Sequence, residues 1–267
     1  MEDDKMLTGI FDSHAHYDDE AFAEDRAGIL HTLPQKGVCG VINAASNLES
    51  ANQCIHLAEQ YDFIYAAAGI HGLDVETVRP DSMERLAALL SHRKVVAVGE
   101  IGLDYHYDTP RDEQMKLIRA QLALAKDFDL PVILHDREAH APMLELLREF
   151  RPRGVVHCFS GSVEMMREVV SLGLMIGLGG AVTFKNAVQP VRVAGEVPSD
   201  RLLLETDAPY MTPVPLRGRR NDSSLIVHTA MKIAEIRGEE AQTVIDRGRE
   251  NTCRLFGITL PEPQVSF

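Results

Sequence analysis

The stretch Gly9-Ile10-Phe11-Asp12-Ser13-His14-Ala15-His16 joins a short apolar run to an end that carries two histidines. Similar apolar, β-branched runs recur along the chain, and a longer segment with helical periodicity follows each of them. This alternation is typical of parallel strands joined by crossover helices. It predicts eight strands, at residues 9–13, 37–43, 63–69, 95–101, 131–135, 154–157, 174–178 and 201–205.

The segments between these runs have the spacing of apolar residues that amphipathic helices require. Start and stop signals agree with this spacing, since Thr109-Pro110 precedes one segment, Ser162 precedes a second and Gly173 follows it. The pattern predicts helices at residues 50–60, 82–91, 111–128, 142–150, 163–172 and 223–237.

Eight alternations without a Gly/Ser-rich linker or a break in composition favour a closed barrel over a doubly wound open sheet. The chain has 267 residues, which is close to the usual length of one β/α barrel. We therefore predict an α/β fold, a single (β/α)8 TIM-type barrel that forms one domain over residues 1–267. Residues 261–267 hold two prolines and are predicted to be a short tail.

The charge and the cysteines restrict the class of protein. A formal net charge of -13, from 40 acidic and 27 basic side chains, argues against wrapping a nucleic acid by bulk electrostatics, although a local basic site remains open. Residues 1–9 lack the pattern of a secretory signal, and no apolar run approaches the roughly 20 residues of a membrane span. The four cysteines lie far apart and form no CxxC pair, which predicts free thiols and a cytoplasmic protein. The lack of a long apolar run predicts no membrane contact.

The ends of the predicted strands carry residues that bind metal ions. In parallel barrels the active site collects at the carboxyl ends of the strands. Alternation along the first strand puts His14 and His16 on the same side, where both face the barrel mouth. Four further strands end in a histidine or a carboxylate, and together they would close a shell of nitrogen and oxygen ligands. The predicted metal ligands are His14, His16, Glu100, His135, His157 and Asp207.

The set is large enough for two ions. Glu100 can bridge them, because a carboxylate has two oxygens. The expected division puts one ion on His14, His16 and Asp207 and the other on His135 and His157. We therefore predict two divalent cations, Mg²⁺, Mn²⁺ or Zn²⁺.

Single histidines carry less information than this set. A lone histidine at a strand end is usually a structural or a surface residue, whereas five strand ends that each offer a ligand type are not expected by chance. His71 follows the third predicted strand and should face the mouth without an obvious partner ligand. Support of a metal ligand and contact with the substrate are both open for it.

The motifs at these strand ends resemble the TatD family of metal-dependent deoxyribonucleases, within the amidohydrolase-like barrels. The resemblance covers nearly the whole chain, and the motifs stand in the family's order. They are Asp12-Ser13-His14-Ala15-His16, Gly99-Glu100-Ile101-Gly102-Leu103-Asp104-Tyr105, His157-Cys158-Phe159-Ser160-Gly161, Glu205-Thr206-Asp207-Ala208-Pro209-Tyr210 and the basic loop at residues 212–221.

The resemblance implies the same six metal ligands, and nuclease activity supported by Mg²⁺ or Mn²⁺. Two departures stand out. Family members often carry His-Pro-His after the third strand, where this chain has His71-Gly72-Leu73. The family's Arg-Asn-Glu-Pro appears as Arg220-Asn221-Asp222-Ser223. The first departure concerns contacts with substrate and leaves the metal ligands intact.

The expected reaction is hydrolysis of a phosphodiester by a metal-activated water, with Asp207 and Glu100 as the catalytic residues. Asp207 would orient the water and accept its proton, and Glu205 would support the metal ligands by hydrogen bonding. The expected substrate is single-stranded DNA, shortened from one end by a monomer or weak oligomer. The expected contacts to its backbone, from a locally basic mouth, are Arg217, Arg219 and Arg220.

Two other functions fit the same residues. The first is hydrolysis of an amide or ester, including deacylation of a mischarged aminoacyl-tRNA, because the same activated water can attack a carbonyl carbon. The second is a non-catalytic metal-binding barrel. Asp207 argues against the second, since a purely structural site has no need of a spare carboxylate beside an open position.

Overall fold

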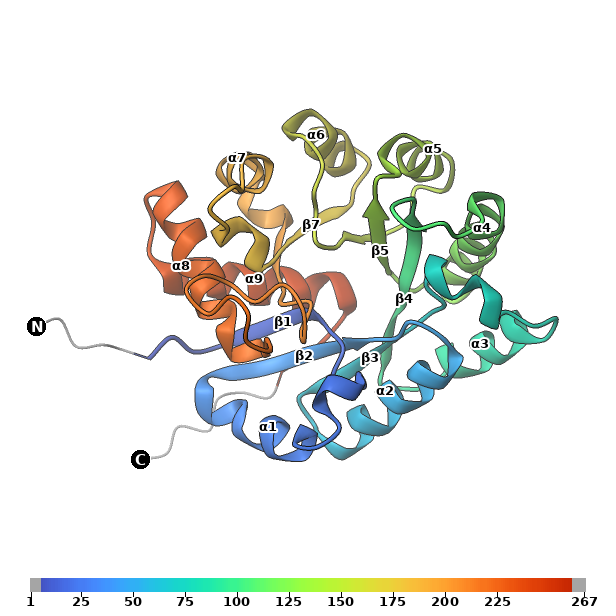
Figure 1. The fold of residues 1–267 in the computed structure, drawn as a ribbon, viewed down its shortest axis with the longest axis horizontal. Coiled ribbons are helices and arrows are strands. Elements are labelled where there is room, and N and C mark those ends of the chain that lie inside the picture. The colour runs from blue at the N-terminus through green and yellow to red at the C-terminus, as the bar shows by residue number, and fades with distance from the viewer. Residues whose placement is uncertain (1–5, 261–267) are drawn as a thin grey trace, which may run out of the picture.

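The computed structural model describes residues 6–260, so the tail predicted at residues 261–267 lies outside the described part. Its centre is one sheet of eight parallel strands in sequential order, which Figure 1 shows surrounded by helices. The strands are β1 Ile10–Ala15, β2 Val38–Ala44, β3 Ile64–Ala68, β4 Val95–Asp104, β5 Val132–Arg137, β6 Gly154–Val156, β7 Met175–Leu178 and β8 Leu202–Leu204. The predicted barrel fold is confirmed.

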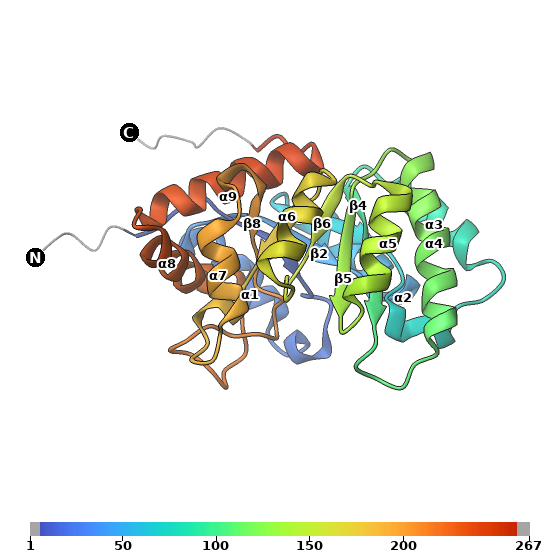
Figure 2. The same ribbon diagram turned by 90° about the horizontal axis from the view of Figure 1, so that it is seen from above.

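Helices cover the outside of the sheet and run against its strands (Figure 2). Ser162 caps α6 by accepting a hydrogen bond from the backbone N–H of Met165 at 3.2 Å, and Gly173, with a φ of 98°, follows its end. The helices are α1 Arg26–Thr32, α2 Leu48–Gln60, α3 Ser82–Leu90, α4 Arg111–Asp127, α5 His140–Phe150, α6 Val163–Ser171, α7 Gln189–Glu196, α8 Ile226–Arg237 and α9 Ala241–Phe256. Sequence periodicity marked six of them; α1, α7 and α9 are additional. Within residues 6–260 no helix is long and apolar enough to cross a membrane.

The first and last strands meet beyond the end of β8. Ala15 pairs with Ala208 as a parallel bridge, and the backbone N–H of Asp207 donates to the carbonyl of His14 at 2.9 Å. The hydroxyl of Ser13 adds a bond to the carbonyl of Leu204 at 3.0 Å. These contacts hold the residues after β8 beside the end of β1, where the sequence places its histidines.

The buried apolar residues form two separate clusters. The larger cluster lies between the strands and the helices. The smaller one takes side chains from every strand, among them Phe11, Ala67 and Ile133, and adds Phe256 and Ile258 from the end of α9 and the residues after it. Because this second cluster fills the barrel interior, the remaining inward-facing positions lie toward the carboxyl ends of the strands.

Candidate metal centre

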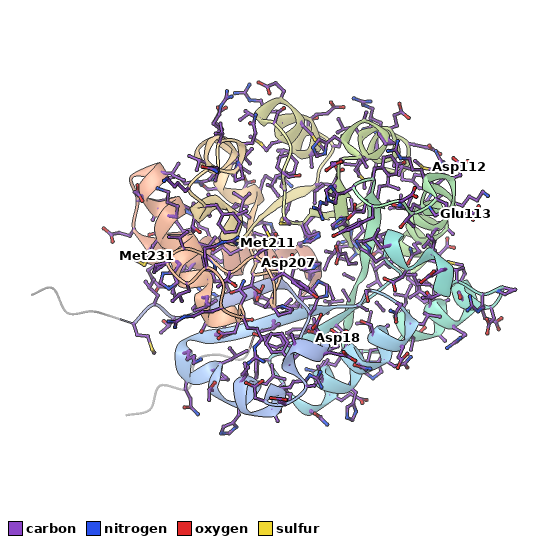
Figure 3. The ribbon with its side chains drawn as sticks, in the orientation of Figure 1. Asp18, Asp112, Glu113, Asp207, Met211 and Met231 are labelled. Carbon is purple, nitrogen blue, oxygen red and sulfur yellow. The ribbon has the colours of Figure 1, made fainter. Side chains whose placement is uncertain are left out.

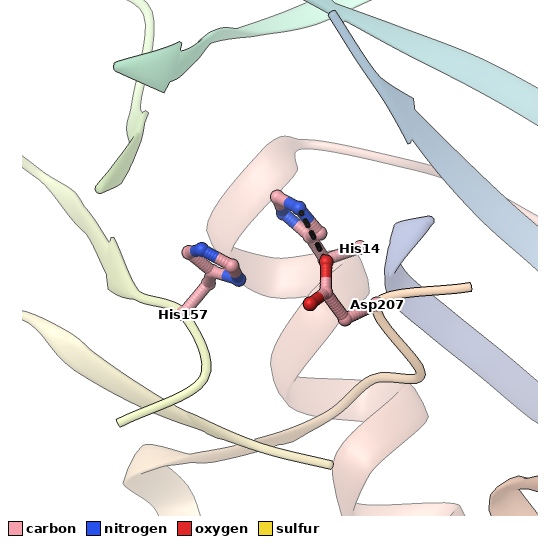
Figure 4. Close-up of side chains that lie close together, drawn as sticks. All are labelled: His14, His157 and Asp207. Carbon is pink, nitrogen blue, oxygen red and sulfur yellow. Dashed lines mark ion pairs between the residues drawn. The ribbon is translucent and has the colours of Figure 1, made fainter. Parts of the chain in front are cut away.

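The six predicted ligands come from five strand ends and converge on one point. β1 and the residue after it supply two of them, β4 and β5 supply one each, and the segments that follow β6 and β8 supply the last two. Figure 4 shows three of these side chains together, with Asp207 directed toward His14. The residues that the structure brings together are His14, His16, Glu100, His135, His157 and Asp207.

Four of these side chains form a first group of donors. Nε2 of His14 is 3.0 Å from Nε2 of His16, and Oε2 of Glu100 is 3.3 Å from the first and 3.5 Å from the second. Oδ1 of Asp207 lies 3.6 Å and 3.3 Å from the same two nitrogens. Two ligands about 2.1 Å from one ion, at right or tetrahedral angles, are separated by roughly 3.0–3.4 Å. The spacing of this group therefore fits one cation.

The other oxygen of Glu100 belongs to a second group. Oε1 is 2.9 Å from Nδ1 of His135 and 2.8 Å from Nε2 of His157, and these two nitrogens are 3.2 Å apart. The spacing again fits a single cation. One carboxylate thus faces both groups, which is the arrangement that a bridging ligand requires.

Hydrogen bonds at the outer ring nitrogens determine which nitrogen faces the centre. His16 Nδ1 donates to the carbonyl of Ala44 at 2.8 Å, and His135 Nε2 donates to Oδ2 of Asp104 at 3.1 Å. A neutral imidazole carries one proton, so each ring presents a bare nitrogen to the carboxylates opposite. Lone pairs then face one another at close range. A cation between them removes this repulsion, and the residues present therefore fit a metal ion.

The pKa values of His16 and Glu100 show that the group of ligands favours a positive charge at its centre. Burial lowers the pKa of His16, but the carboxylates of Asp207 and Glu100 outweigh it and raise that pKa to about 10. Burial would raise the pKa of Glu100, yet the imidazoles of His157 and His14 hold it well below its usual value. Divalent cations satisfy this preference without a proton.

Glu205 supports the segment that carries His157. Its Oε1 accepts a hydrogen bond from the backbone N–H of Cys158 at 2.5 Å, which fixes the residue next to His157. Glu205 is buried, and burial raises its pKa to about 8. A Cβ on Gly177 of β7 would lie 2.3 Å from Oε2 of Glu205, so a larger residue there would have to displace this carboxyl. Glu205 thus contacts the segment that carries His157, and its role in supporting the metal ligands stays a prediction.

Two carboxylates that the sequence analysis did not single out also position the centre. Asp104 orients His135, as described above. Asp12 is fully buried and accepts hydrogen bonds from the backbone of His14, from the backbone and hydroxyl of Thr206, and from the hydroxyl of Ser223 at 2.7 Å. It thereby links β1 to the segment after β8. Both residues stand within the motifs quoted from the sequence, and that position was the available signal.

His71 reaches the second group from the loop after β3. Its Nε2 is 3.5 Å from Oε1 of Glu100, while its Nδ1 accepts a hydrogen bond from the backbone N–H of Leu73 at 3.1 Å. The proton of the neutral ring is therefore on Nε2. His71 presents a hydrogen-bond donor to Glu100, whereas a metal ligand needs a lone pair.

A cavity of about 810 Å³ opens above the two groups. None of the three arginines expected at the mouth is among its lining residues. Arg220 pairs with Asp25 at 2.6 Å, and the guanidinium of Arg217 lies 3.9 Å from the centre of the Phe184 ring; Arg219 is exposed. Among the lining residues within 6–260, the only arginine or lysine is Arg137, at the end of β5, which the sequence analysis missed.

The opposite wall of the cavity is acidic. Asp18, which follows β1, lies below Asp207 in Figure 3, and both line the cavity. The locally basic mouth expected from the sequence is therefore not what the structure has. The carboxylates that line the outer wall are Asp18, Asp19, Glu20, Glu49 and Asp74.

The barrel and its donor set define a class of protein, in which imidazoles and carboxylates gather at the carboxyl ends of parallel strands as in metal-dependent hydrolases. A sequence model of the family described as TatD related DNase matches residues 11–257, and the chain belongs to this family. The family expected from the motifs is thereby confirmed.

Similar proteins match along nearly their whole length. YabD of Bacillus subtilis (strain 168), named an uncharacterized metal-dependent hydrolase, is 38% identical over 253 residues, which cover 93% of this chain and 99% of that protein. The 3′-5′ ssDNA/RNA exonuclease TatD of Pectobacterium parmentieri (strain WPP163) is 35% identical over 260 residues, which cover 93% and 100%. The crystal structure of YJJV, a TatD homologue from Escherichia coli K12, gives a TM-score of 0.89 at 37% identity and covers 95% of this chain and 100% of its own. These matches confirm the predicted enzyme class, a hydrolase.

Proposed function

We propose that this chain is a metal-dependent exonuclease that hydrolyses phosphodiester bonds of single-stranded DNA. The observation that carries the proposal is the position of Glu100, whose two oxygens face two different groups of donors. The relative named as a 3′-5′ ssDNA/RNA exonuclease supports a nucleic acid as the substrate. In the proposed assignment His14, His16 and Asp207 would hold one divalent cation and His135 and His157 a second, Mg²⁺, Mn²⁺ or Zn²⁺, and Glu100 would contribute an oxygen to each.

Divalent cations in such a site would activate a water molecule and neutralise charge on a phosphate. The part of Asp207 is to orient that water and accept its proton. Its contacts with His14 and His16 use Oδ1, and its side chain is 19% exposed, so Oδ2 can meet water from the cavity. Asp207 has a φ of 59°, a left-handed conformation held by its bond to the carbonyl of His14.

The charge around the cavity favours the end of a strand over a long duplex. A polyanion that extended along the acidic wall would be repelled, and Arg137 is the arginine available inside. A strand end needs few phosphate contacts, and low affinity for long nucleic acid agrees with the net charge of -13.

The experiment that tests this proposal is degradation of end-labelled single-stranded DNA by metal-stripped protein, re-supplied separately with Mg²⁺, Mn²⁺ or Zn²⁺. The informative variant is Asp207→Asn, because asparagine readily adopts a left-handed φ and so keeps the backbone. Asp127→Asn, an exposed change at the end of α4, is the control. We expect stepwise shortening that needs metal, persists in the control and is lost in Asp207→Asn.

Other outcomes select other functions. Metal-loaded protein that shortens no strand with any ion would contradict the nuclease proposal, and aminoacyl-tRNA and amide substrates would be assayed next. Metal binding without turnover of phosphodiester, ester or amide would favour the non-catalytic barrel.

A further inference from the structure

The loop after β4 places an aromatic side chain at the edge of the metal cavity. Tyr107 is 53% exposed and lines both the cavity above the metal ligands and a neighbouring hollow of about 590 Å³, formed by residues 105–112. Asp112, labelled in Figure 3, stands at the start of α4 on the far side of this hollow. Exposed aromatic rings beside a concave site are the usual platforms for unpaired bases.

A guanidinium lies against this ring. Arg137 stands two residues beyond His135 on β5, so alternation puts both side chains on the same face of the strand. Its guanidinium is 5.4 Å from the centre of the Tyr107 ring. The two carboxylates beside it in the sequence have other partners, because Asp136 pairs with His140 and Glu138 with His106. Arg137 is thus held by an aromatic contact that leaves its N–H groups available for an anion.

The rest of the cavity is negatively charged, which distinguishes it from the side that carries Arg137 and Tyr107. The wall over β1–β3 is acidic. Tyr210 is a second exposed tyrosine at the mouth, with 56% of its surface exposed. It donates its hydroxyl proton to the carboxylate of Asp19, on this wall, at 2.7 Å. A phosphate is repelled there and attracted by Arg137. The cavity therefore offers a nucleotide one favourable approach, over β4 and β5.

We propose that Tyr107 and Arg137 form a binding subsite for the nucleotide next to the scissile phosphate, with the base stacked on the Tyr107 ring and a phosphate bound by Arg137. This inference rests on the proposed function in one respect, that the substrate is a nucleic acid strand. The subsite binds by stacking and charge, so it accepts any base but requires that a base be present.

The test is a binding experiment that does not depend on turnover. Labelled hexadeoxynucleotides, either intact or abasic at the 3′ or the 5′ terminal nucleotide, are titrated with Mg²⁺-supplied protein and followed by fluorescence anisotropy. All proteins carry Asp207→Asn, so that the strand stays intact. We expect the abasic strand to bind about 5- to 100-fold more weakly at one of the two ends, the range of measured base–aromatic stacking.

Four variants in the same background separate the two contributions. Tyr107→Ala should weaken binding of the intact strand and abolish the difference between intact and abasic strands, whereas Tyr107→Phe should keep the difference. Arg137→Gln should weaken both strands alike and reduce the slope of log affinity against log salt by about one contact. Tyr210→Ala, the matched tyrosine on the acidic wall, should keep the difference.

Two negative results have different meanings. If Tyr107→Ala still distinguishes intact from abasic strands as the parent protein does, the subsite is wrong and the proposed nuclease function is untouched. If no hexadeoxynucleotide binds the parent protein at all, both the subsite and the nucleic-acid substrate are wrong.

Discussion

Asp104 accepts hydrogen bonds from two donors, which makes Asp104→Asn a sharp test of the second group of metal ligands. Oδ2 accepts from Nε2 of His135 at 3.1 Å, and Oδ1 accepts from the backbone N–H of His106 at 3.0 Å. The side chain is buried, so water has little access to replace either bond. An asparagine has one oxygen, so its NH₂ group must face one of these two donors.

Both orientations of the asparagine have a cost. If the NH₂ faces His135, the ring proton must move to Nδ1, the atom that lies 2.9 Å from Glu100, and the lone pair for a cation is lost. If it faces His106, the partly buried backbone N–H of His106 loses its partner at a cost of about 1 kcal/mol. Changes to residues that orient metal ligands typically lower affinity or activity 10- to 100-fold. We expect the second cation to bind 10- to 100-fold more weakly and the first to be unaffected.

The assay is isothermal titration calorimetry of metal-stripped protein with Mn²⁺, with Asp127→Asn as the matched control. Thermal unfolding in EDTA separates a loss of metal affinity from a loss of folding. Two cations bound to Asp104→Asn with unchanged affinity would refute the argument from the orientation of His135.

Three further predictions concern stability and charge. Gly177→Ala places a Cβ against the buried carboxyl of Glu205 and should destabilise the metal-free protein by about 1–3 kcal/mol in urea denaturation; unchanged stability would mean that Glu205 moves freely. Asn251→Ala removes a partly buried hydrogen bond to the carbonyl of Ser199 and a buried one to that of Leu202, which join α9 to the start of β8, and should cost about 2–3 kcal/mol in the same assay. Because Arg137 is the arginine inside the cavity, the slope of log nuclease activity against log salt should be roughly -1 to -2, and a much steeper slope would indicate many phosphate contacts.

The period-two alternation of side chains along a strand explains which metal-ligand candidates can be predicted from the sequence. On β5 and β6 an interior residue and a metal-ligand candidate are two positions apart, Ile133 with His135 and Val155 with His157. Once the strand is recognised, period-two alternation places the histidine at the mouth. The barrel and these two positions could therefore be predicted from hydrophobic pattern and residue type.

On β1 and β4 the same alternation does not predict which residue reaches the centre. Ala97 lies in the interior cluster, and even spacing from it selects Gly99, while the residue that reaches the centre is Glu100. The register with β5 shifts within this part of β4, and the pairing of β1 with β2 shifts similarly between Asp12 and Ala15. A one-residue shift has no signature in the hydrophobic pattern. These ligands were predicted from residue type and from their place at the strand ends, and the resemblance to the family implied the same residues.

Side-chain direction accounts for the remaining differences. The close spacing of Arg217, Arg219 and Arg220 in the sequence predicted a basic cluster at the mouth. In the structure Arg217 lies against Phe184 and Arg220 pairs with Asp25. The predicted end of β5 was His135, whereas the strand continues to Arg137, because Gly102 to Asp104 of β4 pair with it. The extra residues carry Arg137 into the cavity, and no pattern of charge along the chain indicated it.

Two cations that share Glu100 would bind together, so the number of Mn²⁺ ions that the protein binds tests this arrangement directly. Metal-stripped wild-type protein and Glu100→Gln are titrated with Mn²⁺ in a calorimeter, and thermal unfolding in EDTA verifies that both are folded. We expect two ions for the wild type, each adding about 2.7 kcal/mol of stability at a hundredfold excess over its dissociation constant, and one or none for Glu100→Gln. Fewer than two ions in the wild type, or two in Glu100→Gln with unchanged affinity, would contradict it.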